Sequence, residues 1–145
     1  MKRLPTEIDD LVLIEPDVHG DERGFFVEAF RAGWMDELGI DVEFVQQNHS
    51  RSVGPVLRGI HRQAGQAKLV RCARGRIWDV AVDLRPASPT YRRREGRELA
   101  DRNHRQLYIP DGFGHGFCLL SDEADVVYLL SDYYDPERES GIAWD

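Results

Sequence analysis

The sequence predicts an all-β domain in which many short strands form a sandwich or barrel. Three observations lead to this prediction. Short apolar runs recur along the chain with turn-forming residues between them, helical spacing appears in one segment only, and no linker or shift in composition divides the chain. A length of 145 residues suits one domain, so we expect a single domain over residues 1–145.

The predicted strands are apolar or alternating runs bounded by Gly, Pro, Asp or Asn. In chain order they cover residues 10–15, 25–30, 44–50, 56–63, 68–72, 76–84, 106–110, 116–120 and 126–131. Residues 17–24 (DVHGDERG) are rich in turn formers, and residues 85–101 are expected to form an exposed connection followed by a strand. Gly75 lies between two of the runs, which predicts a hairpin joining residues 68–72 to residues 76–84.

One segment has helical spacing. Residues 31–39 carry Trp34, Met35 and Leu38 three or four positions apart and end at Gly39, a common helix terminator. We therefore expect one or two short helices beside the strands.

Composition excludes several classes of protein. The formal net charge is -7, which disfavours general binding to nucleic acid or to acidic membranes. No apolar run approaches the roughly 18 to 20 residues that cross a bilayer, and the first ten residues lack the apolar core of a signal peptide. We expect a cytoplasmic protein with no nucleic-acid or membrane partner.

The five histidines do not have the spacing of a metal site. The sequence has no His-x-His, no His-Glu-x-x-His and no Cys-x-x-Cys, so we expect no metal. It also has no Gly-x-Ser-x-Gly for a nucleophilic serine and no glycine-rich phosphate loop.

Polar residues on predicted strands are the remaining candidates for chemistry. They are Arg58, His61, Lys68, His115 and Tyr128. A base, a cation and a phenol in one cavity suit proton abstraction beside a carbonyl, because the cation stabilises the enolate and the phenol returns a proton. The alternative is that these side chains simply face solvent.

Arg58 and His61 present a problem of direction. Strict alternation places them on opposite faces of the strand over residues 56–63. Both reach one cavity only if this strand bulges or twists, and Gly59 between them would allow that.

Several motifs, in order along the chain, resemble the dTDP-4-dehydrorhamnose 3,5-epimerase family. They are residues 20–28 (GDERGFFVE), 45–52 (VQQNHSRS), 56–61 (VLRGIH), 68–71 (KLVR), 78–85 (WDVAVDLR), 88–90 (SPT), 109–117 (IPDGFGHGF), 132–137 (DYYDPE) and 141–144 (GIAW). The resemblance implies a cupin-type jelly-roll barrel that forms a homodimer. It also implies cofactor-free epimerisation, at C3, C5 or both, of a nucleotide-linked (dTDP) 4-keto-6-deoxyhexose.

The resemblance also implies roles for individual residues. His61 matches the base, Lys68 the cation near the 4-keto oxygen, and Tyr128 the acid. The implied substrate and subunit contacts are Arg23, Phe25, Glu28, Gln46, Asn48, Arg58, His115 and Tyr134. We expect the domain to lack the family's usual C-terminal segment, whose Asp orients the base, and Asp79 or Asp83 is a candidate substitute.

Two other functions remain open from the sequence. A 3,4-ketoisomerase would use the same enolate chemistry, although a second His near His61 would be expected and residue 63 is Gln. A non-catalytic dimer that binds sugar nucleotides is the other alternative.

Overall fold

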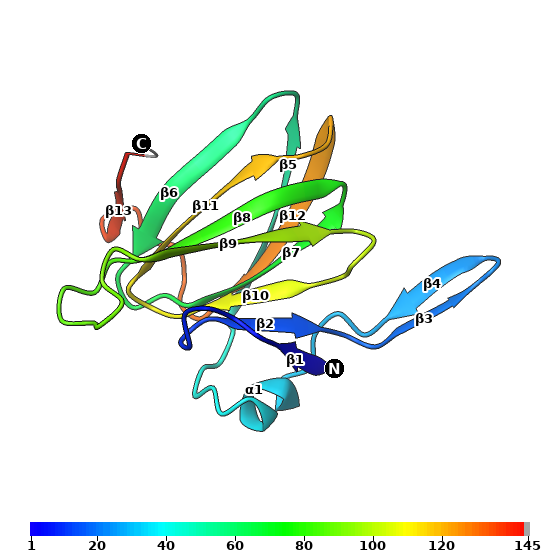
Figure 1. Ribbon diagram of the computed structural model, residues 1–145, viewed down its shortest axis with the longest axis horizontal. Coiled ribbons are helices and arrows are strands. Elements are labelled where there is room, and N and C mark those ends of the chain that lie inside the picture. Colours follow the sequence, from blue (N-terminus) through cyan, green and yellow to red (C-terminus); the bar gives the residue numbers. More distant parts are fainter. Residues whose placement is uncertain (144–145) are drawn as a thin grey trace.

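Residues 1–143, which the computed structural model describes, form two antiparallel sheets that enclose a core, and a separate hairpin that projects from them (Figure 1). The six-stranded sheet has the order β1 (Lys2–Leu4), β2 (Val12–Glu15), β10 (Gln106–Ile109), β7 (Lys68–Arg74), β12 (Glu123–Leu130) and β5 (Gln46–Val53). The five-stranded sheet has the order β13 (Glu139–Gly141), β6 (Leu57–Gln63), β11 (Phe113–Leu119), β8 (Arg76–Asp83) and β9 (Arg94–Ala100). The hairpin consists of β3 (Val18–Asp21) and β4 (Gly24–Val27). The prediction of an all-β jelly-roll barrel is confirmed.

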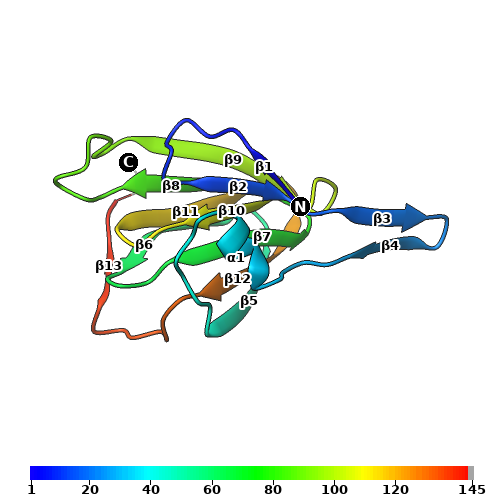
Figure 2. The same cartoon turned by 90° about the horizontal axis from the view of Figure 1, so that it is seen from below.

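Side-chain alternation separates the core from the outer faces of the sheets. On β7, Val70 and Cys72 belong to the cluster between the sheets, whereas Leu69 belongs to a second cluster on the outer face. That outer face is covered by the segment before β5, which includes the helix α1 (Gly33–Glu37), as Figure 2 shows. The inner faces of the strands therefore determine which side chains can reach the space between the sheets.

The helix is in the predicted place but shorter than residues 31–39. Trp34 and Met35 are buried on its inner side, and Gly39 adopts a positive φ of 70° just beyond it. Glycine takes this conformation without a steric cost, so it stops the helix.

The predicted hairpin between residues 68–72 and 76–84 is wrong. β7 pairs with β10 and β12, whereas β8 pairs with β11 and β9, so the two strands lie in different sheets. Gly75, with φ of 83°, carries the chain from one sheet to the other. A turn signal shows that the chain reverses, but it does not show whether the two strands then share hydrogen bonds.

Three short strands were not predicted: β1, β3 and β13. Their residues are mostly exposed, so they lack the apolar alternation on which strand prediction depends. β3 falls within residues 17–24, which were expected to form a turn. Within residues 1–143, no helix is both long enough and apolar enough to span a bilayer.

Candidate active site

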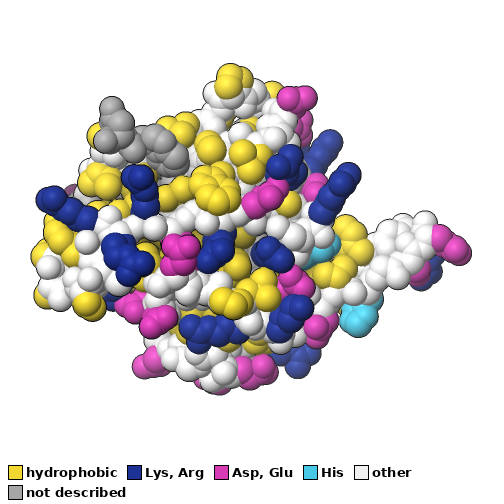
Figure 3. Space-filling view, viewed as in Figure 1, with side chains coloured by type: hydrophobic (Ala, Val, Ile, Leu, Met, Phe, Trp, Pro, Cys, Tyr) yellow, Lys and Arg dark blue, Asp and Glu magenta, His cyan; other side chains and the backbone are white. Residues whose placement is uncertain are grey.

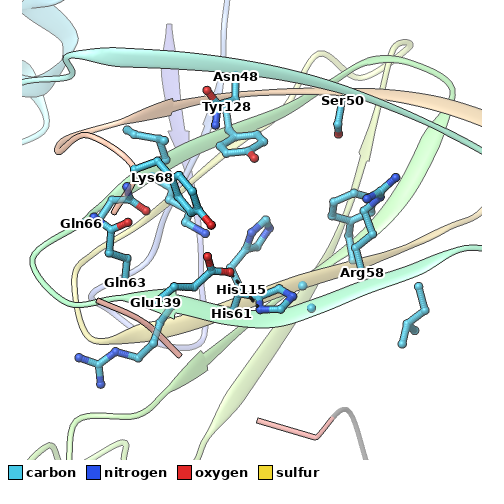
Figure 4. Close-up of a pocket in the computed structure, with 17 residues that line it drawn as sticks. Asn48, Ser50, Arg58, His61, Gln63, Gln66, Lys68, His115, Tyr128 and Glu139 are labelled. Carbon is cyan, nitrogen blue, oxygen red and sulfur yellow. Dashed lines mark ion pairs between the residues drawn. The ribbon is translucent and has the colours of Figure 1, made fainter. Parts of the chain in front are cut away.

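A cavity of about 470 Å³ lies between the two sheets, and most of the residues that line it have polar side chains. Side chains from β5, β7 and β12 line one side, and side chains from β6 and β11 line the other. Figure 4 shows Asn48 and Tyr128 on one side and His61, His115 and Arg58 on the other. The cavity continues the interior of the barrel, where polar residues replace the apolar ones of the core.

Lys68 and Tyr128 come from neighbouring strands of the six-stranded sheet. Lys68 lies two residues before Val70 on β7, so both side chains are on the same face of the strand and point inward. Its Nζ atom lies 5.9 Å from the centre of the Tyr128 ring. Burial lowers the pKa of the Lys68 ammonium, and the carboxylates of Asp79 and Glu139 oppose that effect.

Arg58 and His61 both line the cavity because β6 bulges between them. His115 lies opposite His61 and Phe117 lies opposite Arg58, so three steps along β6 match two steps along β11. Gly59, at φ of 120°, packs so closely on β11 that an added Cβ would come within 2.8 Å of the His115 carbonyl oxygen. The predicted bulge at Gly59 is confirmed.

His115 forms a buried pair with Asp79. The His115 Nε2 atom lies 2.6 Å from Asp79 Oδ1, and the exposed fractions of the two residues are 7% and 0%. Asp79 faces inward from β8 between Ile77 and Ala81, both of which belong to the core. An ionised carboxylate only accepts hydrogen bonds, so the His115 tautomer that carries its proton on Nε2 is the one that fits this pair.

His61 lies beside a carboxylate that the sequence analysis missed, Glu139 of β13. Its Nδ1 atom is 3.5 Å from Glu139 Oε1. The expectation that Asp79 or Asp83 would accompany His61 is wrong, because Asp79 pairs with His115, and Asp83 accepts hydrogen bonds from Arg85, Ser88 and Thr90. β13 is short and exposed, and no pattern in the sequence marked it as a strand.

Tyr134, Asn48 and Gln46 are connected at one end of the cavity. Tyr134 and Asn48 line it. The Gln46 side chain donates to Asn48 Oδ1 at 3.0 Å and accepts from the Tyr134 backbone N–H at 3.1 Å. Gln46 itself does not line the cavity but joins two residues that do.

Arg23, Phe25 and Glu28 lie away from this chain's own cavity, on the projecting hairpin or just after it. Arg23 pairs with Asp21 at 2.6 Å, and Glu28 pairs with Arg31 at 2.7 Å. The Phe25 ring packs edge-on to His104, with 4.7 Å between ring centres. The structure therefore divides the predicted site residues into a group at the cavity and a group on the hairpin.

The cavity group can support chemistry on a substrate beside a carbonyl. An imidazole and a phenol come from opposite sheets, and a partly buried ammonium lies next to the phenol. No group of three or more His, Cys, Asp or Glu residues that could hold a metal ion occurs within residues 1–143. The cationic side chains that line the cavity are Arg58, Arg62 and Lys68.

Comparisons with known proteins identify the family to which the chain is similar. A model of the dTDP-4-dehydrorhamnose 3,5-epimerase family matches residues 5–145. The enzyme of that name from Shigella flexneri is 51% identical over 99% of this chain and 82% of its own length.

Solved structures show the same likeness. The epimerase from Legionella pneumophila, in complex with dTDP-4-keto-L-rhamnose, superposes with a TM-score of 0.95 at 49% identity, covering 99% of this chain and 78% of its own. A 3'-monoepimerase from Streptomyces bikiniensis, in complex with dTDP-quinovose, has a TM-score of 0.88 at 37% identity, covering 95% of this chain and 72% of its own. The chain therefore belongs to the dTDP-4-dehydrorhamnose 3,5-epimerase family.

Proposed function

We propose that this protein is an isomerase that epimerises a dTDP-linked 4-keto-6-deoxyhexose at C3, C5 or both. The observation that supports it most strongly is the placement of His61 and Tyr128 on opposite sides of one cavity, with the Lys68 ammonium beside Tyr128. Inversion at carbon requires a proton to leave one face and another to arrive on the opposite face. A base and an acid that face each other across the substrate meet that requirement.

The reaction proceeds through an enolate. His61 removes the proton from the carbon next to the 4-keto group, and the electron pair of the broken C–H bond moves onto the carbonyl oxygen. Lys68 stabilises the negative oxygen. Tyr128 then gives its phenolic proton to the opposite face of the carbon while the carbonyl reforms, and solvent restores both side chains to their starting protonation states.

The nucleotide portion of the substrate is assigned to the end of the cavity where Tyr134 and Asn48 lie. An aromatic ring offers a stacking surface to a base. Arg58 and His115 are assigned to sugar or phosphate contacts. The relative from Bacillus anthracis was solved with TDP and pyrophosphate bound, which supports the choice of a dTDP-linked substrate.

A homodimer explains the hairpin. Figure 3 shows it standing clear of the body of the protein. Phe25 and Phe26 are 61% and 72% exposed, and aromatic side chains left open in this way mark a contact surface. We assign Arg23, Phe25 and Glu28 to the partner subunit's site. Sedimentation at micromolar concentration should give about twice the chain mass of 16.7 kDa, and a monomer would contradict the assignment.

The cytoplasm is the proposed location. Cys72 and Cys118 are both free, as is usual where thiols are kept reduced.

Deuterium wash-in tests the proposed function directly. The protein is incubated in D₂O with dTDP-4-keto-6-deoxyglucose, and incorporation at C3 and C5 is followed by NMR. Exchange at either carbon with inversion supports the epimerase, and the carbons labelled show whether one or two are inverted. Migration of the keto group to C3 would indicate a ketoisomerase, and binding without exchange would indicate a non-catalytic binder. Either result would overturn the proposal.

A further inference from the structure

Glu139 is the carboxylate beside the candidate base. We propose that it is a positioning residue for His61, holding the Nδ1 edge of the imidazole so that Nε2 remains available to take the substrate proton. The functional part of this inference rests on the proposed function, in which His61 is the base. The contact itself is independent of that function and can be measured separately.

Strand pairing fixes the two side chains relative to each other. β13 runs antiparallel to β6, with Gly141 opposite His61 and Glu139 opposite Gln63, so Glu139 is the diagonal neighbour of His61. Diagonal neighbours on one face of a sheet are within reach of long side chains. An added Cβ at Gly141 would come 3.0 Å from the Ile60 carbonyl oxygen and 3.4 Å from His61 Nδ1, so glycine lets β13 approach β6 closely beside the ring. Figure 4 shows the Glu139 carboxylate beside the His61 ring.

The segment that carries Glu139 is tied to β6 from both ends. Before Glu139, the Gln63 side chain donates to the Tyr133 carbonyl at 2.9 Å and accepts from the Asp135 N–H at 2.8 Å. After it, the Ile142 N–H donates to the Ile60 carbonyl at 3.0 Å. Because the segment is held in place on both sides of Glu139, its carboxylate loses little conformational entropy when it orients the His61 ring.

Glu139 also contacts other parts of the site. The Glu139 carboxylate beside the Tyr134 hydroxyl raises the pKa of that phenol. The negative charge of Glu139 also favours the charged form of Lys68. The carboxylate therefore lies among the candidate base, the candidate enolate-stabilising cation and the wall of the nucleotide site.

The distance fits a positioning role. A separation of 3.5 Å is an ion-pair distance rather than a short hydrogen bond. Hydrogen bonds to catalytic bases often tighten only when substrate binds. Once His61 has taken a proton, the imidazolium and the carboxylate attract each other, which favours the protonated state that proton abstraction creates.

No other carboxylate within residues 1–143 forms an ion pair with His61. The neighbouring titratable or charged side chains at the cavity are Arg58 and Arg62 on the same strand, His115 on β11, Lys68 on β7, Tyr128 on β12 and Tyr134 before β13. None of these neighbours is a carboxylate, so Glu139 is the group that places a negative charge beside the His61 ring.

The test is the tautomer of the His61 imidazole, followed by ¹⁵N NMR in the full chain, with Glu139→Gln, Glu139→Asp and Glu137→Gln as variants. Glu137 is an exposed carboxylate on the same segment, so its variant is a matched control. A carboxylate beside Nδ1 favours the tautomer that carries the proton on that nitrogen, so we expect Glu139→Gln to shift the ring toward the Nε2–H tautomer, with no change in Glu137→Gln. Glu139→Asp keeps the charge and should stay closer to wild type. An unchanged tautomer ratio in Glu139→Gln would overturn the proposal.

Deuterium exchange supplies the second readout. Glu139→Gln should lower kcat by about 10²-fold, the lower end of what a general base contributes, with KM within a few-fold of wild type. Glu137→Gln should leave both constants unchanged. A Glu139→Gln variant whose KM rises as much as its kcat falls would show a merely structural role and overturn the proposal. If wild type gives no exchange while the His61 tautomer still shifts in Glu139→Gln, the contact stands and the proposed function fails.

Discussion

Two histidines face each other across β6 and β11, and each has its own carboxylate, yet the two pairs are built differently. His115 and Asp79 are buried and 2.6 Å apart. The side chains of His61 and Glu139 are 56% and 31% exposed, and their nearest N and O atoms are 3.5 Å apart. One pair lies deep between central strands, and the other lies at the sheet edge, where β13 is added.

The difference separates two tasks. A close, buried pair holds its ring in one arrangement, because breaking a short hydrogen bond is costly in a low-dielectric interior. A looser, half-exposed pair leaves its ring accessible to solvent. The comparison therefore supports the proposal that His61 transfers the proton and that His115 presents a fixed edge to the cavity.

The largest effect should come from His61→Asn. Loss of the base should slow exchange by about 10²–10⁴-fold. Affinity for dTDP should stay within a few-fold, since the nucleotide is assigned to contacts with Tyr134 and Asn48 rather than with His61. The matched variant His115→Asn should slow exchange less and destabilise the fold more. Near-normal turnover in His61→Asn would contradict the assignment of the base.

Lys68→Ala should have the next largest effect. Removing one donor to a developing oxyanion typically costs about 10²–10³ in rate, and we expect a loss of that size in deuterium exchange. Lys68→Arg should restore little, because a planar guanidinium differs in shape from an ammonium. Chelators should leave the rate unchanged.

The pH dependence gives a second check on Lys68. Burial lowers its pKa below the ordinary value of 10.5. The ammonium is lost as pH rises through this lowered pKa, so exchange should decline on the alkaline side. A silent Lys68→Ala variant, or inactivation by chelation, would contradict this mechanism.

The two pairs should rank in the opposite order for stability and for activity. The variant in the buried pair should lose more stability, and the variant in the exposed pair should lose more activity. Asp79 Oδ2 has no hydrogen-bond partner within residues 1–143, so the amide of Asp79→Asn places donors in a buried position without acceptors. Each unsatisfied buried group costs about 1–3 kcal/mol, and urea unfolding should show a loss in that range. Glu139→Gln should stay within about 0.5 kcal/mol of wild type. Equal losses in the free energy of unfolding would contradict the difference in structural role between the two pairs.

The sequence predicted the fold class because alternation and turns recur in almost every long strand. The same alternation, with a bulge at Gly59, predicted that Arg58, His61, Lys68 and Tyr128 could share a cavity. The prediction from alternation and turns failed where strand pairing depends on how the sheets are arranged in space. Gly75 marked a turn but could not show that β7 and β8 separate into two sheets.

Glu139 was missed for a related reason. Three exposed polar residues carry no periodic signal, and β13 exists only because β6 offers it an edge. The Asp79–His115 pair left a weak signal, since an acidic residue within the apolar run of residues 77–82 requires a partner. Which histidine supplies that partner follows from the register of β11 with β8, and sequence patterns do not fix register between strands distant along the chain.

A third histidine–carboxylate pair, on β5 and β12, should give the smallest effect. His49 Nε2 lies 2.9 Å from Asp125 Oδ2, and Arg51 Nε donates to Asp125 Oδ1 at 2.8 Å. Arg51 first, and His49 second, hold the pKa of Asp125 at about 2. Because this pKa is lowered in the folded state, its contribution to stability is present above the unfolded pKa of Asp and is lost as pH falls through about 2. In His49→Gln, Arg51 still holds the carboxylate, so between pH 5 and pH 8 the thermal midpoint and the exchange rate should both equal those of wild type. The roles proposed for His61 and His115 leave no part in the reaction for His49, which does not line the cavity. A loss of activity in His49→Gln would therefore contradict that division of roles.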